Sequence, residues 1–150
     1  MSLRAYVQSA ISMKAIIIFF LLYSCSSTSS KLIRLDKVQS EDLALDRLVV
    51  ALLITEDCSV CQSQLSILKN CVVQDRVAVF IEGEDEEKLR QVVRKKKINF
   101  PTYRLDQKSK KLFSFGDLTP TLAVKSGGSF KTHVGLISCE ETIKLIKSRP

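Results

Sequence analysis

The sequence predicts a single α/β domain, because two strand-length apolar runs alternate with segments of helical periodicity. The runs at residues 48–54 and 77–81 are uninterrupted, as in central strands that are covered on both faces. From residue 58 onward, apolar residues recur with the period of a helix. The chain has 150 residues, of which 45% are hydrophobic and 26% are charged. This length suits one well-packed domain, and the composition excludes a disordered tail or a collagen-like repeat.

Local signals predict the weaker elements of the first half of the chain. Residues 32–36 are expected to form a short edge strand, and a short helix is expected to begin after Ser40, which is a typical N-cap. Five acids lie within residues 82–87, and residues 94–97 are all basic. A helix between these charge runs would have both ends of its macrodipole satisfied. We therefore predict a surface helix there; the alternative is a basic patch that touches anionic lipid.

The second half of the chain is expected to contain a strand, a hairpin and a last helix. Residues 100–105 are expected to form a short strand entered through a proline, and residues 108–111 a solvated turn. A Gly-Gly pair between residues 121–124 and residues 130–134 indicates a β-hairpin. Ser138 is a typical N-cap for a last amphipathic helix. The predicted order is therefore β-α-β-α, an irregular stretch, a hairpin and a final helix.

Residues 1–24 are predicted to be an export signal and not part of the domain. Lys14 precedes an apolar run at residues 15–22, and Met13 is a candidate for the true start of translation. The run is shorter than the roughly 20 residues needed to cross a bilayer core, and it suits the apolar region of a signal peptide. Export would place the cysteines where disulfides form and persist.

The end of the apolar run, Leu22-Tyr23-Ser24-Cys25, resembles the lipobox of bacterial lipoproteins. In that family the cysteine is lipidated and becomes the mature N-terminus. The resemblance implies that Cys25 anchors the chain to a bacterial membrane, with residues 25–31 as a flexible polar tether and residues 32–150 as the folded domain. The alternative is an ordinary cleaved signal in which Cys25 has no role.

The charge and the cysteine and histidine counts exclude several classes of function. The net charge is +7, but the basic residues are dispersed, so no nucleic-acid partner is predicted. Five cysteines with a single histidine lack the clustered ligands of a zinc finger. We expect neither a metal ion nor a cofactor.

The segment Cys58-Ser59-Val60-Cys61 lies where the first buried strand ends and a helix begins. A spacing of three within one helical turn brings the two sulfurs close enough for a disulfide ring. The free N–H groups and the dipole at a helix N-terminus favour a thiolate, and such placement lowers a cysteine pKa from about 8.5 into a range of roughly 3.5–7.5. Cys58 is therefore the predicted attacking thiol, and Cys61 the thiol that resolves the mixed disulfide. The alternative is a purely structural disulfide.

With these features the chain resembles the thioredoxin superfamily, and within it the membrane-anchored extracytoplasmic thiol–disulfide oxidoreductases related to cytochrome-maturation proteins. The resemblance covers about residues 45–148. Thr119-Pro120-Thr121 resembles the cis-proline segment of the family, and His133-Val134-Gly135 resembles the entry into its last helix. The resemblance implies a thioredoxin-like three-layer fold with a central mixed β-sheet flanked by helices. It also implies that Thr119 and Pro120 face the cysteine pair and bind the backbone of a substrate.

The predicted active site departs from the family pattern at three places. Asp57 stands where the family has a tryptophan, Ser59-Val60 where it has Gly-Pro, and Leu52 where thioredoxins have a buried acid that assists proton transfer. Because Leu52 cannot accept a proton, Glu56 and Asp57 are the candidate proton acceptors for the second cysteine. Their negative charge also opposes ionisation of the first cysteine.

The remaining cysteines, Cys71 and Cys139, are expected to be buried, unpaired thiols. A thioredoxin fold would place them at opposite ends of neighbouring helices, too far apart for a disulfide. The single histidine, His133, is expected to be a surface or packing residue rather than a metal ligand.

The resemblance implies an exported enzyme, lipid-anchored on the extracytoplasmic, periplasmic side of a bacterial membrane. Its partners would be protein thiol and disulfide substrates and a redox partner protein. Two alternatives stay open: delivery of copper through Cys58 and Cys61, and a thioredoxin-like binding module without catalysis. An assay of disulfide exchange with a Cys58→Ser variant separates the enzyme from the binding module.

Overall fold

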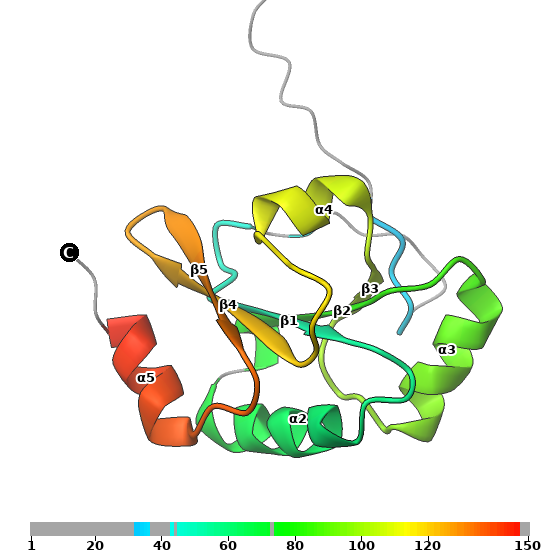
Figure 1. The fold of residues 1–150 in the computed structure, drawn as a ribbon, viewed down its shortest axis with the longest axis horizontal. Helices are drawn as coiled ribbons and strands as arrows, with labels where there is room; N and C mark the ends of the chain where they lie inside the picture. The colour runs from blue at the N-terminus through cyan, green and yellow to red at the C-terminus, as the bar shows by residue number, and fades with distance from the viewer. Residues whose placement is uncertain (1–31, 37–42, 44, 73, 148–150) are drawn as a thin grey trace, which may run out of the picture.

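A five-stranded mixed β-sheet forms the middle layer of the protein (Figure 1). In the computed structural model, which describes residues 32–36, 43, 45–72 and 74–147, the strands follow the order β3-β2-β1-β4-β5. They are β1 (Val50–Ile54), β2 (Val77–Ile81), β3 (Thr102–Arg104), β4 (Thr121–Ser126) and β5 (Ser129–Val134). Because β1 is parallel to β2 and antiparallel to β4, the predicted mixed sheet is confirmed.

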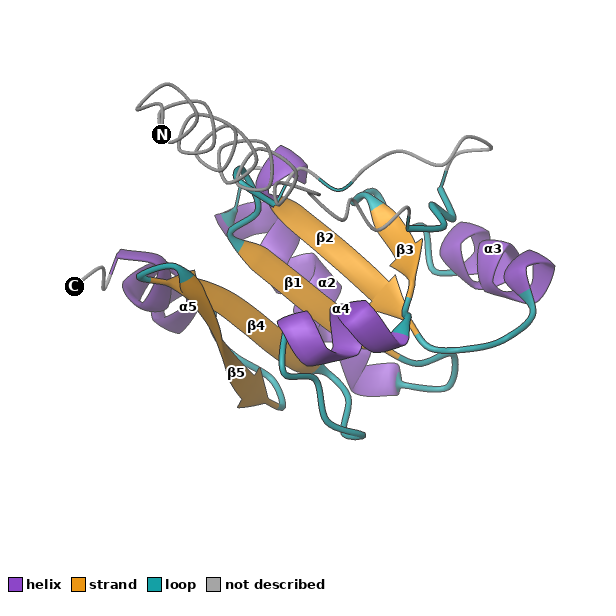
Figure 2. Ribbon diagram, turned by 90° about the horizontal axis from the view of Figure 1, so that it is seen from above, coloured by secondary structure: helices purple, strands orange, loops and turns teal. Residues whose placement is uncertain are grey.

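Helices cover both faces of this sheet. They are α2 (Ser59–Cys71), α3 (Glu86–Lys95), α4 (Gln107–Leu112) and α5 (Cys139–Lys147), with a short 3-10 helix η1 (Gln74–Arg76). Figure 1 shows α4 above the sheet and α2 and α5 below it. Seen from above, α4 lies over the central strands and α2 lies behind them (Figure 2). This is the three-layer arrangement that the family resemblance implies.

The core is divided in two by the sheet, because successive side chains of a strand point to opposite faces. On the face covered by α2 and α3 the buried side chains are mostly aliphatic. They include Val50, Leu52, Ile54, Leu65, Leu68, Leu89 and Val92. On the face covered by α4, aromatic side chains are the largest buried groups, namely Phe80, Tyr103, Phe113 and Phe115. Both faces of β1 are therefore buried, which explains its uninterrupted apolar sequence.

The surface helix predicted between the two charge runs is confirmed as α3. The Asp85 carboxylate caps it and accepts a hydrogen bond from the backbone N–H of Lys88 at 3.1 Å. Acids occupy its first turn, and Arg94 and Lys95 occupy its last. Within it, Arg90 and Glu86 form an ion pair at 2.6 Å. The charges are thus arranged as the helix dipole favours.

One predicted turn is wrong, because residues 107–112 form helix α4. The Asp106 carboxylate caps this helix and accepts a hydrogen bond from the backbone N–H of Ser109 at 2.7 Å. The sequence shows no amphipathic stripe here, since Leu112 is the only apolar residue of the helix. The cap itself was the one signal that could have predicted it.

The edge strand predicted at residues 32–36 is reduced to one antiparallel bridge, between Arg34 and Tyr103. The start of the helix predicted after Ser40 lies outside the described residues, and residues 45–47 form a turn. The predicted signal, Cys25 and the tether also lie outside them. Within the described ranges, no helix has both the length and the apolar character needed to cross a bilayer.

Candidate active site

The turn from β1 into α2 places Cys58 at the N-cap of the helix. Its backbone is extended, with φ −76° and ψ 104°, and its Sγ accepts a hydrogen bond from the backbone N–H of Cys61 at 3.1 Å. The backbone N–H of Cys58 in turn donates to the carbonyl of Thr55 at 3.4 Å. The sulfur therefore takes the place of a capping oxygen, where helix N–H groups would also stabilise a thiolate.

Cys58 and Cys61 form a disulfide with an S–S distance of 2.08 Å and a Cα–Cα distance of 5.3 Å. Cys61 is fully buried, whereas Cys58 is only partly buried. The more accessible residue of the pair is thus the one at the helix N-terminus. A thiol or thiolate arriving from solvent reaches the disulfide from the side of Cys58.

The loop before β4 lies against the turn that holds Cys58. The Thr119–Pro120 peptide bond is cis, as the resemblance implies. The hydroxyl oxygens of Thr55 and Thr119 are 3.1 Å apart and share a hydrogen bond, which joins the end of β1 to this loop. Strand β4 begins at Thr121, which pairs with Leu53 of β1. The structure therefore brings Thr119 and Pro120 to the edge of the sheet that carries the cysteine pair.

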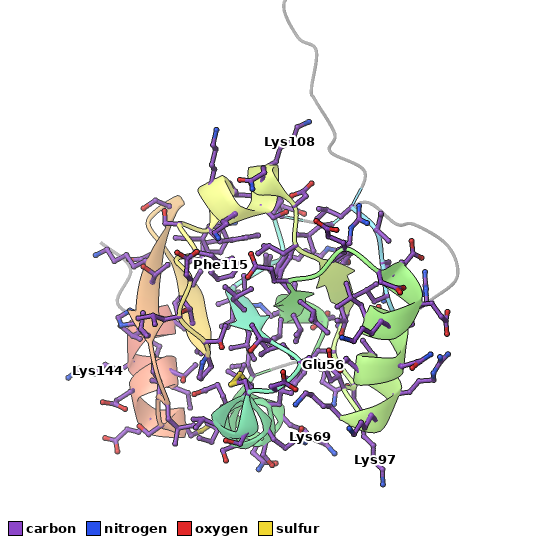
Figure 3. The ribbon with its side chains drawn as sticks, turned by 45° about the vertical axis from the view of Figure 1, so that its right-hand side comes forward. Glu56, Lys69, Lys97, Lys108, Phe115 and Lys144 are labelled. Carbon is purple, nitrogen blue, oxygen red and sulfur yellow. A yellow bond between two sulfur atoms is a disulfide. The ribbon has the colours of Figure 1, made fainter. Side chains whose placement is uncertain are left out.

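Two acids and one lysine flank the start of α2. Glu56 is exposed beside it (Figure 3) and forms an ion pair with Lys88 of α3 at 3.0 Å. The hydrogen bond from this contact, together with the negative charge of Glu56, raises the pKa of Lys88 above its ordinary value. Asp57 is exposed and forms no ion pair with a described residue. Leu52, at the position of the family's buried acid, is completely enclosed by apolar side chains.

Four exposed apolar side chains lie in or next to the cysteine turn, the cis-proline loop and the end of β5, and the sequence did not predict them as a group. We call them the apolar rim: Val60, Leu118, Val134 and Leu136. Val60 lies between the two cysteines, and Leu118 directly precedes the cis-proline loop and is 65% exposed. The apolar residue just before Thr119-Pro120 was a usable sequence signal, because a solvated loop does not require one.

Backbone contacts position the other two members of the rim. Val134 pairs with Thr121, the residue after Pro120. The next residue, Gly135, donates its N–H to the carbonyl of Pro120 at 2.8 Å and has a φ of +94°, which favours glycine. Leu136 then continues toward α2. The rim therefore extends from the cysteine turn across the proline loop to the end of β5.

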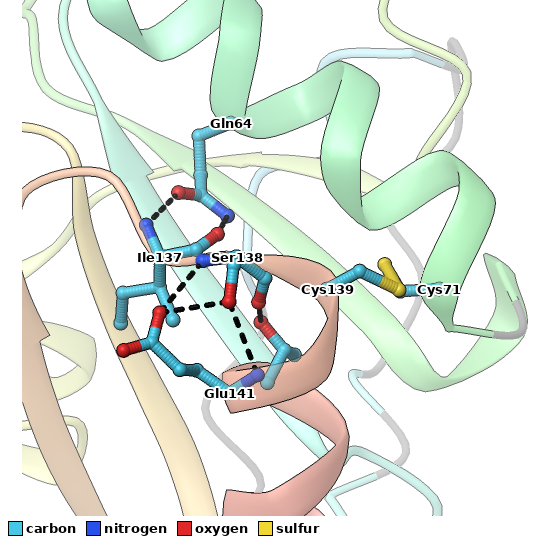
Figure 4. Close-up of a disulfide and its surroundings, with 7 residues drawn as sticks. Gln64, Cys71, Ile137, Ser138, Cys139 and Glu141 are labelled. Atoms are coloured by element: carbon cyan, nitrogen blue, oxygen red, sulfur yellow. Dashed lines mark hydrogen bonds between the residues drawn. A yellow bond between two sulfur atoms is a disulfide. The ribbon is translucent and has the colours of Figure 1, made fainter.

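A buried glutamine holds this last segment against α2. The Gln64 side chain accepts a hydrogen bond from the N–H of Ile137 at 2.8 Å and donates one to the carbonyl of Ile137 at 3.3 Å. Gln64 is fully buried, so both bonds replace water (Figure 4). The role of Gln64 could not be predicted from the sequence, because a side-chain amide that pairs with a distant backbone has no local signature.

The expectation that Cys71 and Cys139 are unpaired is wrong, because they form a second disulfide with a Cα–Cα distance of 5.5 Å (Figure 4). The expectation placed α5 at the wrong point along α2. Residues 135–138 have no regular structure and reach from Pro120 past Gln64. Four such residues span up to about 13 Å, which is most of the length of α2. The start of α5 therefore meets the last turn of α2.

The start of α5 is held by a capping box as well. The Ser138 hydroxyl accepts from the N–H of Glu141 at 3.2 Å, and the Glu141 carboxylate accepts from the N–H of Ser138 at 3.1 Å. The hydrogen bonds from the Ser138 hydroxyl and N–H lower the pKa of Glu141. The predicted N-cap at Ser138 is thus confirmed.

The remaining candidate, His133, lies on β5 and is half-buried, with no hydrogen-bond partner for its Nε2 among the described residues. In the described part of the chain, no group of three or more His, Cys, Asp or Glu residues is arranged to hold a metal ion.

No protein-family model and no curated protein matches the sequence. Several solved structures do match in fold. One is a secreted disulfide oxidoreductase of Mycobacterium tuberculosis homologous to E. coli DsbE, with a TM-score of 0.59 and 14% identity over 79% of this chain and 94% of that chain. A DsbF homologue from Corynebacterium diphtheriae has a TM-score of 0.59 and 17% identity, over 84% of this chain and 96% of that chain.

StoA from Bacillus subtilis is also similar, with a TM-score of 0.53 and 15% identity over 79% of this chain and 99% of that chain. At these identities the likeness shows the fold: the chain has a thioredoxin-like α/β fold, as the sequence predicts.

Proposed function

We propose that this protein is an exported thiol–disulfide oxidoreductase that exchanges disulfides with cysteines of other proteins through Cys58 and Cys61. The observation that carries the proposal is their disulfide at the N-terminus of α2. The turn before it is joined to the cis-proline loop by the hydrogen bond between Thr55 and Thr119. The likeness in fold to a secreted disulfide oxidoreductase and to a thiol:disulfide interchange protein supports the proposal.

In the proposed reaction the reduced protein attacks a client disulfide. The Cys58 thiolate bonds to one client sulfur, and the other client sulfur leaves as a thiolate. The Cys61 thiolate then attacks the Cys58 sulfur, which forms the intramolecular disulfide and releases the first client sulfur. Two electrons pass to the client, and the same steps in reverse oxidise a client dithiol. A redox partner protein returns the pair to its starting state.

The chain's other groups would bind the client and accept a proton. Thr119 and Pro120 are the proposed contacts for the client backbone, and the apolar rim for its side chains. Cys61 must lose its proton before it attacks. Glu56 is already engaged by Lys88 at 3.0 Å, whereas Asp57 forms no ion pair with a described residue, so Asp57 is the better candidate acceptor.

The proposed location is the extracytoplasmic side of a bacterial membrane, with lipidated Cys25 as the anchor. Two disulfides within one small domain suit an oxidising compartment, because cytosolic thiols are kept reduced. Labelling of expressing bacteria with a clickable fatty acid tests the anchor. The wild-type chain should incorporate the label, and the Cys25→Ala variant should not.

Reduction of insulin with dithiothreitol as the electron source tests the activity. The wild type should accelerate insulin reduction, and Cys58→Ser should lower the rate to that of dithiothreitol alone. The double variant Cys71→Ala/Cys139→Ala is the matched control, because it also removes a disulfide but should keep the activity. If Cys58→Ser is as active as the wild type, the protein is not an oxidoreductase at this site.

A further inference from the structure

A groove with a volume of about 520 Å³ begins at Cys58 and follows α2. The α2 residues that line it include Gln62, Ser66 and Lys69, which together with Cys58 recur every three or four positions and so form one face of the helix. At 1.5 Å per residue, the distance from Cys58 to Lys69 is about 16 Å along the helix. An extended peptide of about five residues has this length.

Four lysines line this groove, and no acid does. Lys69 comes from the last turn of α2, and Lys95, Lys96 and Lys97 come from the end of α3 and the residues after it. Figure 3 shows Lys69 and Lys97 projecting on the same lower side of the molecule. Within the described ranges, none of the four forms an ion pair, although lysines elsewhere do, such as Lys88 with Glu56. We call this surface, Cys58 with the four lysines, the basic groove.

A hydrogen bond from a side chain to the backbone joins the two sides of the basic groove. The Gln62 side chain donates a hydrogen bond to the carbonyl of Lys96 at 3.4 Å, which links α2 to the end of α3. The apolar base consists of Leu65, Ile98 and Phe100, all of them buried. Helix dipoles explain a lysine at each helix end, but they do not require the two ends to share a concave surface with a reactive cysteine.

We propose that the basic groove binds an acidic, extended segment of the client protein next to the client's reacting cysteine. This inference rests on the proposed function and adds the substrate class. A concave surface with an apolar base accepts the side chains of a peptide, whereas a flat bilayer surface would not reach its base. Glu56 and Asp57 lie on the other side of Cys58, toward β1, where their negative charge disfavours acidic residues of the client. Acidic residues are therefore favoured on only one side of the client's cysteine.

Symmetrical disulfides of labelled peptides, whose fluorescence rises on reduction, test this selectivity with the reduced full chain. Each peptide has one cysteine, and its other residues are neutral, acidic on the N-terminal side or acidic on the C-terminal side. One acidic peptide should show a kcat/KM about 3- to 10-fold above the neutral peptide, which is the scale of a few exposed ion pairs. The gain should shrink as salt is added, because exposed charges are screened.

Two triple variants with the same change of net charge separate the groove from the overall charge. Lys95→Gln/Lys96→Gln/Lys97→Gln should abolish the gain. Lys108→Gln/Lys111→Gln/Lys144→Gln, which changes exposed lysines of α4 and α5, should keep it. The single variant Lys69→Gln should reduce the gain in part, and it disturbs neither helix cap. Equal rates for all three peptides, or a gain that survives in the groove variant, would overturn the proposal.

Two further outcomes are distinguishable. If the wild type reduces none of the peptides, the proposed function fails rather than the selectivity. Co-sedimentation with phosphatidylglycerol vesicles tests whether the lysines bind anionic membrane lipid instead of an acidic client. If the groove variant loses vesicle binding, the control variant keeps it and the three peptides react equally, the lysines contact membrane lipid and the client proposal is wrong.

Discussion

Each of the two disulfides of this domain includes a cysteine of α2, the first at the start of the helix and the second at its end. Cys58–Cys61 encloses one turn at the start of α2, with a sequence separation of 3, and Cys71–Cys139 joins the end of α2 to α5, with a separation of 68. In the loop-entropy model the longer loop stabilises the fold by about 4 kcal/mol and the shorter by less than about 2 kcal/mol. The first bond therefore costs little to open, and the second restrains the unfolded chain.

The two ends of α2 also differ in how well they stabilise a thiolate. Cys58 caps the N-terminus of α2, where N–H groups stabilise a thiolate and make the sulfur a good leaving group. Cys71 lies at the C-terminus of the same helix, where the dipole opposes a thiolate. Cys139 is the first residue of α5, but two acids, Glu140 and Glu141, occupy the same turn, and their negative charge opposes a thiolate there. The setting of a disulfide, and not its presence alone, therefore indicates exchange chemistry.

The largest expected effect is on catalysis, and it belongs to the first disulfide alone. Cys61→Ser should leave Cys58 able to attack a client but unable to release it, so turnover should fall to background while a mixed disulfide accumulates. Mass spectrometry of the alkylated reaction mixture measures that species. The Cys139→Ser variant is the control, and accumulation of a mixed disulfide in it instead would reverse the roles assigned to the two pairs.

The second disulfide should dominate stability. Cys71→Ala/Cys139→Ala should lower the free energy of unfolding by about 2–4 kcal/mol, because the unfolded chain gains the freedom of a long loop. Urea denaturation of the oxidised proteins measures this change. Insulin reduction by the double variant should stay close to that of the wild type below the denaturation midpoint. Unchanged stability together with lost activity would make the second pair part of the exchange chemistry.

The next largest effect should come from Gln64, since it joins α2 to the segment between the apolar rim and the second disulfide. Gln64→Leu leaves the N–H and the carbonyl of Ile137 without partners, and each buried unpaired group costs about 1–3 kcal/mol. We expect a loss of at least about 2 kcal/mol in the free energy of unfolding, measured by urea denaturation. We also expect weaker client binding, seen as a raised KM, because Leu136 of the apolar rim directly precedes Ile137. Gln62→Leu, which removes one exposed bond to Lys96, is the matched control and should change stability little.

The smallest effect concerns the cap beside the second disulfide. The folded pKa of Glu141 is lowered, so its charge stabilises the fold above its unfolded pKa, and this contribution is lost as pH falls through the folded pKa. Glu141→Gln should therefore lower the Tm slightly at about pH 7, and the difference from the wild type should disappear once the pH is below the folded pKa of Glu141. Thermal unfolding followed by circular dichroism measures both. A Tm difference that persists undiminished in acid would assign the effect to side-chain shape rather than charge.

The parts of the fold that depend on local pattern could be predicted from the sequence. The apolar runs of β1 and β2, the Gly-Gly hairpin turn and the charges of α3 each follow from short-range physical chemistry. The cysteine turn could be placed because it separates a strand period from a helix period. The cis bond before Pro120 came from family resemblance, since no local propensity makes cis the favoured state.

What could not be predicted depends on the path of irregular chain. The pairing of Cys71 with Cys139 follows from where residues 135–138 carry the start of α5, and no periodicity describes such a segment. The hydrogen bonds of Gln64 depend on the same path. Helix α4 was missed for a different reason: it lies over an aromatic half of the core that other segments supply, so its own sequence contains almost no apolar residue.

The most direct test is a redox titration of the wild type in dithiothreitol buffers of graded potential. The thiols are alkylated at each step, and each cysteine is identified by mass spectrometry. The Cys58–Cys61 pair should open at the less negative potential, while Cys71 and Cys139 stay unlabelled until the buffer is more reducing. Opening of Cys71–Cys139 first, or of both pairs together, would contradict the assignment of exchange to one disulfide and stability to the other.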